Sequence, residues 1–207
     1  MTYRKRIAQF ATKAIAFPSA RIAVAVFALL AGGSATASST NTDEPLKSAI
    51  AGEQRSAAHK QRDAARHPYE TLQFFGIRPD MHVVEIIPGG GWYTEILAPY
   101  LRDHGKLILA APDPASASDY SRRSAANLKK KLEASPAVFD QVSVGVFEPP
   151  ANIHFADNNS VDMVLTFRNV HNWAADGDAT VQSVFQHIYD SLKPGGVFGV
   201  VDHRLPV

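Results

Sequence analysis

The sequence predicts an α/β fold built on a parallel, doubly wound sheet. Short apolar runs alternate with longer segments whose apolar residues recur at helical spacing, which is typical of strands joined by helical crossovers. A glycine-rich turn at 88–91 follows one of these runs, at the kind of position where open α/β sheets bind their ligands. The chain has 207 residues and 45% hydrophobic content, which is enough for one domain with a sizeable core.

The first 37 residues differ in composition from the rest of the chain. They hold five basic residues between Arg4 and Arg21 and no acidic residue, then an apolar stretch at 22–31 and the small residues Ala35-Thr36-Ala37. This order predicts a secretory signal peptide at 1–37 and an exported, periplasmic protein. An uncleaved anchor and an organellar transit peptide are the alternatives. After cleavage we expect no membrane span, because the apolar stretch is too short to cross a bilayer.

Charge and composition exclude several kinds of partner. The net charge is +1, but beyond residue 37 the chain carries 16 basic and 20 acidic residues, a net charge of −4. No part of this pattern indicates nucleic-acid binding. The chain has no cysteine, so disulfides are excluded, and we predict no metal site. The sequence does not indicate an oligomeric state.

Residues 38–80 are predicted to form a linker and N-terminal helices. Ser, Thr and Asn dominate the first eight of these residues, which is typical of a short linker. Residues 46–66 are rich in alanine and in charged residues, and we expect one helix there. A second helix should begin at Pro68, because proline suits the first helical turn, and end at Gly76.

The most informative element is a predicted strand, turn and helix at 81–101. Val and Ile dominate Met81–Ile87 without sustained alternation, as in a parallel strand that is buried on both faces. Gly89, Gly90 and Gly91 end the strand, and glycine lets a ligand lie against the backbone because it has no Cβ. A helix follows, so its free N–H groups face the crevice at the strand ends. We therefore expect a nucleotide-like ligand at this turn.

Glu85 helps to decide which ligand binds there. Glycine-rich turns after a first strand serve both dinucleotides and S-adenosylmethionine. A dinucleotide places its anionic pyrophosphate at the helix end, where a carboxylate on the same strand would repel it. S-adenosylmethionine carries an ammonium and a sulfonium group, which Glu85 would attract, and the turn is too short for the G-x-G-x-x-G of dinucleotide sites. The alternative is a turn that only connects the strand to the helix.

This order of an acid, apolar residues and glycines resembles the first motif of the class I S-adenosylmethionine-dependent methyltransferases, acid, apolar, G-x-G-x-G. Ile87 stands at the first glycine position, and Gly89 and Gly91 fill the other two. The strings VEIIPGGGWYTEILAPYL and TFRNVHNW resemble a group of predicted exported bacterial methyltransferases. The resemblance implies a Rossmann-like class I methyltransferase sheet with S-adenosylmethionine as its cofactor. It assigns Glu85 and the three glycines, Gly90 included, to cofactor binding.

The run RDAARHPYETLQFFGI at 62–77 resembles the same group. In methyltransferases, leading helices of this kind often cover the cofactor. Arg62, Arg66 and His67 could therefore face the site, but we favour a solvated helix surface for these three residues.

Two further strands are predicted at Lys106–Ala111 and Val142–Phe147, with a helix between them. Asp113 is the only acid near the end of the first of these strands, where the ribose of the cofactor would be bound. The family pattern places this acid where Ala111 stands. A ribose ligand and a turn residue in Pro-Asp-Pro are therefore equally good interpretations of Asp113.

A fourth predicted strand, Met163–Phe167, ends in a cluster of polar residues. Arg168, Asn169 and His171 follow it directly. Since the carboxyl ends of parallel strands meet at one edge of a sheet, we expect these side chains to lie level with the glycine turn. The spacing resembles the fourth motif of class I methyltransferases, which implies a position beside the transferred methyl group.

We predict that Arg168, Asn169 and His171 form the catalytic group. His171 could take a proton from the methyl acceptor, because imidazole titrates near neutrality. The alternative, which we favour, is a ring hydrogen-bonded to the backbone beneath the cofactor. Arg168 would bind a carboxylate or phosphate of the substrate, unless it forms an ion pair with Glu85 or Asp162.

A last predicted strand, Val197–Val201, brings the count to five, whereas the resemblance implies seven. We therefore expect a methyltransferase-like domain at 81–207 that is truncated after strand five, lacks its C-terminal hairpin and comes from a fragment. Its last strand would form an unpaired apolar edge.

These features predict an exported enzyme that transfers a methyl group from S-adenosylmethionine to a small molecule. One alternative is an exported binding protein that keeps the fold without turnover. A nicotinamide-dependent oxidoreductase is less favoured, because of Glu85 and the glycine spacing.

Overall fold

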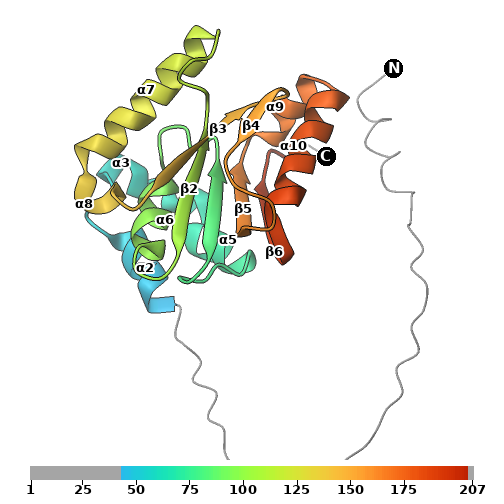
Figure 1. Cartoon of the computed structure of the whole chain (residues 1–207). Coiled ribbons are helices and arrows are strands. Elements are labelled where there is room, and N and C mark those ends of the chain that lie inside the picture. The colour runs from blue at the N-terminus through green and yellow to red at the C-terminus, as the bar shows by residue number, and fades with distance from the viewer. Residues whose placement is uncertain (1–42, 205–207) are drawn as a thin grey trace, which may run out of the picture. The chain divides into compact units, whose positions relative to one another are not determined.

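The computed structural model describes residues 43–204 of the chain. The predicted signal peptide at 1–37 lies outside these residues. In the described part, no helix is both long and apolar enough to cross a membrane. Six strands form one sheet in the order β4-β3-β2-β1-β5-β6, and helices cover it on both faces (Figure 1).

Among residues 43–204, four short helices precede the sheet: α2 (Asp43–Ala51), α3 (Ala57–Lys60), α4 (Asp63–Arg66) and α5 (Pro68–Phe74). The prediction of one helix over 46–66 is wrong, because the chain turns at Gly52, whose carbonyl accepts a hydrogen bond from the N–H of Arg55. Ser56 then caps a new helix, since its hydroxyl accepts a hydrogen bond from the N–H of His59. Pro68 begins α5, as predicted.

The strands are β1 (His82–Ile86), β2 (Lys106–Ala111), β3 (Ser143–Glu148), β4 (Asn152–His154), β5 (Val161–Phe167) and β6 (Leu192–Val201). The α/β class and the five predicted strands are confirmed, and all five pair in parallel. The expected sheet that stops after strand five is wrong, because the sheet has a sixth strand. This strand, β4, runs antiparallel to β3 at the edge opposite β6, and its three residues are too few to show a sequence period.

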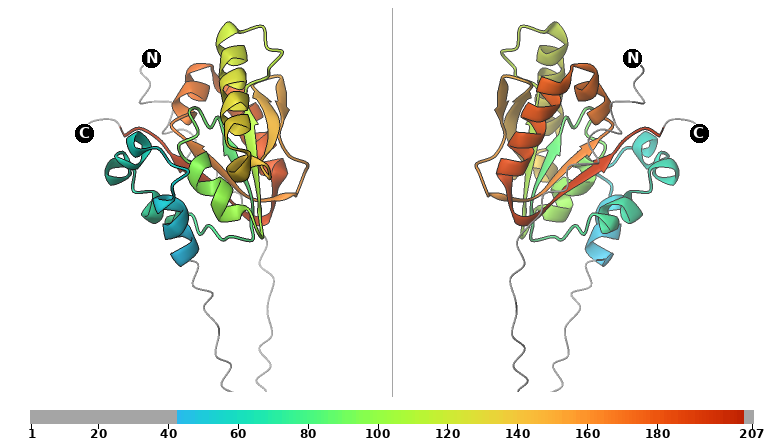
Figure 2. Two further views of the ribbon diagram at one scale, coloured as in Figure 1. Left: turned by 90° about the vertical axis from the view of Figure 1, so that its left-hand side faces the viewer. Right: turned by 90° about the vertical axis from the view of Figure 1, so that its right-hand side faces the viewer.

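Five helices connect the strands: α6 (Thr94–Leu101), α7 (Asp119–Ala134), α8 (Pro136–Phe139), α9 (Val170–Ala175) and α10 (Asp178–Ser191). One face of the sheet packs against α2, α5, α6, α7 and α8, and the other packs against α9 and α10. The side views show the sheet lying between these two groups of helices (Figure 2).

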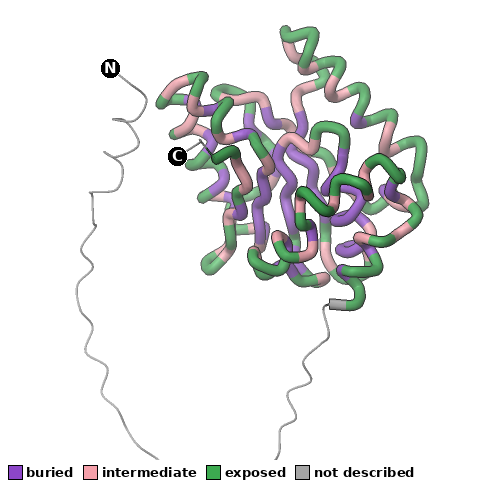
Figure 3. The backbone as a smooth tube through the Cα atoms, turned by 180° about the vertical axis from the view of Figure 1, so that it is seen from behind, coloured by how far each residue is buried: buried purple, intermediate pink, exposed green. Residues whose placement is uncertain are grey.

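Both faces of the central strands are buried, which explains why the sequence of these strands does not alternate. In β1, Val83 packs into the core on the α6 side, whereas Val84 packs into the core on the α10 side. In β2, Leu109 and Ile108 divide between the two cores in the same way. Figure 3 shows the buried strands running through the middle of the domain. Each fully buried side chain of this size contributes about 1.5–3 kcal/mol to folding.

The order of the strands creates a crevice at the carboxyl end of β1. This strand pairs with β2 on one side and with β5 on the other, so that Glu85 lies between Leu109 and Leu165 in the register. The chain leaves β1 and β5 at the same edge of the sheet, and the loops that follow these two strands lie next to each other.

Candidate functional site

The loop after β1 has the backbone conformation that glycine usually provides. Ile87, Gly89 and Gly91 have φ angles of 50°, 58° and 77°. Ile87 stands where the family motif has its first glycine, and it keeps the left-handed conformation at a cost of about 1–2 kcal/mol. A Cβ on Gly89 or Gly90 would meet no atom within 4 Å, so the backbone is open to a ligand there. At Gly91, by contrast, a Cβ would meet the side chain of Lys131.

Glu85 lies at the floor of the site, where it is 2% exposed. Its Oε2 accepts a hydrogen bond of 2.6 Å from the hydroxyl of Thr94. Burial raises the pKa of Glu85 to about 7, and the bond from Thr94 and the charge of Lys131 offset this only in part. A cation placed beside Glu85 would therefore stabilise a carboxylate that is only partly ionised at neutral pH.

A pocket of about 360 Å³ opens above this floor. Glu85, Gly89 and Gly90 line it from the side of β1, and Arg168, Asn169 and His171 line it from the side of β5. The structure thus brings the two predicted groups together in one pocket, from which only Gly91 and Asp113 are missing. A second hollow of about 490 Å³ adjoins it and shares several wall residues with it. Ligand pockets usually fall in this range of volumes.

Three arginines line both hollows: Arg62 and Arg66 from the N-terminal helices, and Arg168 from the end of β5. Arg62 and Arg66 therefore face the site, as the alternative interpretation had it. The favoured interpretation as a solvated surface agrees with the exposure of Arg62 but not with Arg66, which is half-buried. His67 does not line either hollow; it has a φ angle of 46° and lies between α4 and α5. Burial lowers the pKa of Arg66, and the charges of Arg62 and Arg168 lower it further. The three guanidinium groups therefore lie close enough to repel one another.

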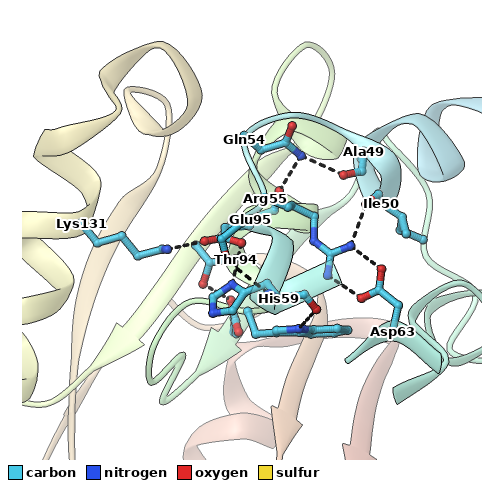
Figure 4. A network of polar contacts seen from close by, with 12 residues as sticks. Ala49, Ile50, Gln54, Arg55, His59, Asp63, Thr94, Glu95 and Lys131 are labelled. Carbon is cyan, nitrogen blue, oxygen red and sulfur yellow. Dashed lines mark hydrogen bonds and ion pairs between the residues drawn. The ribbon is translucent and has the colours of Figure 1, made fainter. Parts of the chain in front are cut away.

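A polar network holds the N-terminal helices against α6 and α7 (Figure 4). Glu95 lies in the first turn of α6, and its carboxylate is hydrogen-bonded to Nδ1 of His59 in α3 at 2.7 Å. The same carboxylate forms an ion pair with Lys131 of α7. Arg55 donates two hydrogen bonds to the carboxylate of Asp63. These contacts fix α3 and α4, which carry the arginines over the pocket.

The first two residues after β5 have different roles in the structure. Arg168 has a φ angle of 64°, and its side chain is exposed to the pocket. The expected ion-pair alternatives do not form, because Asp162 pairs with Lys193 and Glu85 binds Thr94. Asn169 is buried, and its amide donates hydrogen bonds to the carbonyl of Ile86 and to the hydroxyl of Thr166. Asn169 therefore ties the end of β5 to the end of β1.

His171 has a carboxylate partner that the sequence analysis did not identify. Its Nδ1 lies 2.8 Å from Oδ1 of Asp202, a residue that directly follows β6. The favoured interpretation, a ring hydrogen-bonded to the backbone, is therefore wrong. Burial by itself would raise the pKa of Asp202, but hydrogen bonds from His203 and His171 outweigh this effect and lower it. His171 is exposed at the pocket wall beside an ionised acid.

The structure places Asp113 outside the pocket. Its Oδ1 accepts a hydrogen bond from the N–H of Ala115, and its Oδ2 accepts one from the amide of Asn152 in β4. The first bond is that of a turn residue in Pro-Asp-Pro. A ribose contact would require the carboxylate to leave these partners, so its role as a ribose ligand stays a prediction.

Sequence reasoning missed six residues of the pocket wall: His59, Trp92, Tyr93, Tyr120, Phe167 and His203. The ring of Tyr93 stacks on that of Phe167, with 3.5 Å between the ring centroids. Burial raises the pKa of Tyr93 to about 12, so this ring is a neutral, apolar surface inside the pocket. Trp92 and Tyr93 follow the last glycine of the loop, and this position is the one signal in the sequence that could have identified them.

The raised pKa of Glu85 predicts how the stability of the ligand-free protein depends on pH. A carboxyl group whose pKa is about 7 in the folded chain and 4.5 in the unfolded chain stabilises the fold below pH 4.5. This contribution is lost as the pH rises through 7, and it amounts to about 3 kcal/mol. Glu85→Gln cannot titrate. The free energy of unfolding of this variant, relative to that of the natural chain, should therefore rise by about this amount between pH 4.5 and 8.

Urea denaturation of both chains at several pH values in this range measures the difference. All other titrating groups are shared by the two chains and cancel. A difference that does not vary with pH would show that Glu85 titrates at its ordinary pKa.

Comparison with known proteins agrees with this geometry. The family described as "Methyltransferase domain" matches residues 84–200, which is more than half of the chain. No functionally curated protein matches the sequence.

Solved methyltransferase structures are similar to this chain, and the first of those named here has a TM-score above 0.5. A SAM-dependent methyltransferase from Aquifex aeolicus has a TM-score of 0.53 and 16% identity, and the match covers 77% of this chain and 72% of that one. A Methanococcus maripaludis protein assigned as an S-adenosyl-L-methionine-dependent methyltransferase has a TM-score of 0.47 and 20% identity, over 77% of this chain and 60% of that one. On the strength of the family match, this chain belongs to the class I S-adenosylmethionine-dependent methyltransferases.

Proposed function

We propose that the protein transfers the methyl group of S-adenosylmethionine to a small acceptor that carries an anionic group, and that it does so outside the cytosol. The distribution of charge in the pocket carries this proposal. A buried carboxylate lies under the glycine loop, and three guanidinium groups line the walls that the two hollows share.

The residues under the glycine loop fit the cofactor of the family. Glu85 offers a buried acceptor to an ammonium group, and the open backbone at Gly89 and Gly90 leaves room for a ligand to lie against it. When bound, S-adenosylmethionine supplies an activated methyl group on a sulfonium. The protein contributes mainly by positioning the acceptor in line with that group.

The arginines support an anionic acceptor. The single carboxylate of the cofactor can neutralise only part of the positive charge of Arg62, Arg66 and Arg168. The second hollow is bounded by the same arginines and also by the apolar side chains of Ala65, Phe167 and Val201. A guanidinium binds a carboxylate or phosphate through two parallel hydrogen bonds. We therefore assign this hollow to an acceptor with an apolar body and an anionic group.

His171 is the residue best placed to accept a proton from the acceptor. If its Nδ1–H donates to Asp202, the lone pair of Nε2 is free to act as a base. Asn169 takes part by positioning, because its amide bonds hold the Arg168 loop next to the glycine loop. A shared fold does not guarantee catalytic activity, so a binding protein without turnover is the main competing function.

The cofactor assignment predicts that Glu85→Gln weakens binding of S-adenosylmethionine and S-adenosylhomocysteine by at least about tenfold at pH 8, since it removes a charge that a buried ligand needs. Calorimetric titration measures both affinities, and NAD should not bind. Glu133→Gln, on the exposed face of α7, is the matched control and should bind like the natural chain. Equal binding by Glu85→Gln, or binding of NAD alone, would contradict the cofactor assignment.

The acceptor assignment predicts that inorganic phosphate binds the S-adenosylhomocysteine complex and that Arg168→Asn weakens this binding by about tenfold or more. Asparagine tolerates the left-handed backbone at this position, so the loop should keep its shape. Arg78→Gln, in an exposed pair with Asp80, is the control. Because S-adenosylhomocysteine already occupies the pocket under the glycine loop, this calorimetric titration with phosphate tests the second hollow alone. Unchanged phosphate binding by Arg168→Asn would refute the assignment.

Export is supported only by residues 1–37, which lie outside the described residues. It predicts that protein recovered from its native compartment begins near Ser38, which N-terminal sequencing or mass spectrometry measures. An intact Met1 would contradict it. Since S-adenosylmethionine is made in the cytosol, an exported enzyme also needs a supply of cofactor where it works.

A further inference from the structure

Three potential metal ligands meet at the mouth of the pocket. His171, Asp202 and His203 each offer one ligand atom, and these atoms all lie within 4.8 Å of one another. The two imidazole rings lie with their centroids 5.0 Å apart in an edge-on arrangement. Both histidines line the pocket of about 360 Å³ that also contains Glu85 and the glycine loop.

The backbone holds this cluster in place. The pairing of β5 with β6 continues one residue past the end of β5, since the N–H of Arg168 donates to the carbonyl of Val201, the last residue of β6, at 2.7 Å. The carboxylate of Asp202 accepts hydrogen bonds from the backbone N–H groups of His171 and His203. Its orientation is therefore set by the main chain on both sides, before any ligand binds.

We infer that His171, Asp202 and His203 bind one divalent transition-metal ion at the mouth of the pocket. Two imidazoles and one carboxylate suit zinc, iron, cobalt or manganese, whereas calcium and magnesium prefer oxygen ligands throughout. A tetrahedral ion with bonds of about 2.1 Å holds its ligands about 3.4 Å apart. His171 Nδ1 lies 2.8 Å from Asp202 Oδ1, and the three ligand atoms lie within 4.8 Å of one another, so the present spacing is on either side of this value. Both histidine side chains are exposed and have room to adjust.

Three protein ligands leave at least one coordination position open. Sites of this kind bind a water molecule or a substrate oxygen at that position. Because both histidines line the pocket, the ion would present its open position to whatever occupies the pocket. A role for the ion in activating an acceptor oxygen rests on the proposed methyl transfer, whereas the metal site itself does not. An ion bound through His171 would replace this residue as the group that activates the acceptor, because a ligating imidazole has no free lone pair to act as a base.

The same contacts also have a purely structural interpretation. Asp202 could serve only to cap α9 and to hold the ring of His171. This interpretation gives no part to the imidazole of His203, whose side chain is exposed. A variant of His203 therefore separates the two interpretations without disturbing the cap.

The test is calorimetric titration of the full chain, produced without a histidine tag, with Zn²⁺ and with Co²⁺, whose visible absorption also reports nitrogen ligands. We expect one ion per chain. His203→Ala and Asp202→Asn should each weaken binding by about tenfold or more. The control is His104→Ala, an exposed histidine between α6 and β2 at the other end of the strands, which should bind like the natural chain.

Absence of binding would overturn the inference, as would equal affinity in His203→Ala or an equal loss in His104→Ala. The same samples are titrated with S-adenosylhomocysteine. If the natural chain binds the nucleoside but no metal ion, the result counts against the metal site alone. Intact metal binding without nucleoside binding counts against the proposed function alone.

Discussion

The site depends on the parallel pairing of β1 with β5. In this register Glu85 lies opposite Leu165, and both strands end at the same edge of the sheet. The two loops that follow are then forced into contact, and each begins with a residue in the left-handed conformation, Ile87 or Arg168. Such strain persists only where the surroundings hold it. The amide of Asn169, bonded to the carbonyl of Ile86, provides that hold at the point where the loops meet.

A second constraint is electrostatic. The floor of the pocket carries a buried acid, and its walls carry three guanidinium groups that repel one another. Neither group of charges is neutralised by the other, because Glu85 bonds to Thr94 and, among the described residues, forms no ion pair with an arginine. The hydrogen bonds around Glu95 stabilise the position of α3 and α4 over the pocket and so offset the repulsion among the arginines (Figure 4). A ligand that is cationic at one end and anionic at the other would stabilise both the buried carboxylate of Glu85 and the three guanidinium groups.

The parts of the fold that sequence patterns predicted are those that a local signal determines. Short apolar or alternating runs identified the five parallel strands, and the glycines after β1 and the polar residues after β5 identified the two loops of the site. The short strand β4 was not predicted, because three residues are too few to show a strand pattern in the sequence. Arg62 and Arg66 look like any charged helix surface, and only the folding of α3 and α4 over the pocket distinguishes them.

Residues that meet through tertiary contacts could not be found in this way. His171 and Asp202 are 31 positions apart, and nothing near either of them indicates the other. The same holds for the cluster with His203, which is why the sequence predicted no metal site there. Asp113 illustrates the opposite case, because its position after β2 suggested a ligand role that its turn and its bond to Asn152 leave without support.

The position of Trp92 gives the protein an optical reporter of its own. The chain has two tryptophans. Trp92 lines the pocket, with the guanidinium of Arg66 4.6 Å from its ring, whereas Trp173 is buried against Phe147 in the core on the other side of the sheet. An anion that draws Arg66 away from the ring changes the surroundings of one indole and leaves the other as a constant background. Occupancy of this pocket can thus be followed by intrinsic fluorescence, with no label and no knowledge of the acceptor.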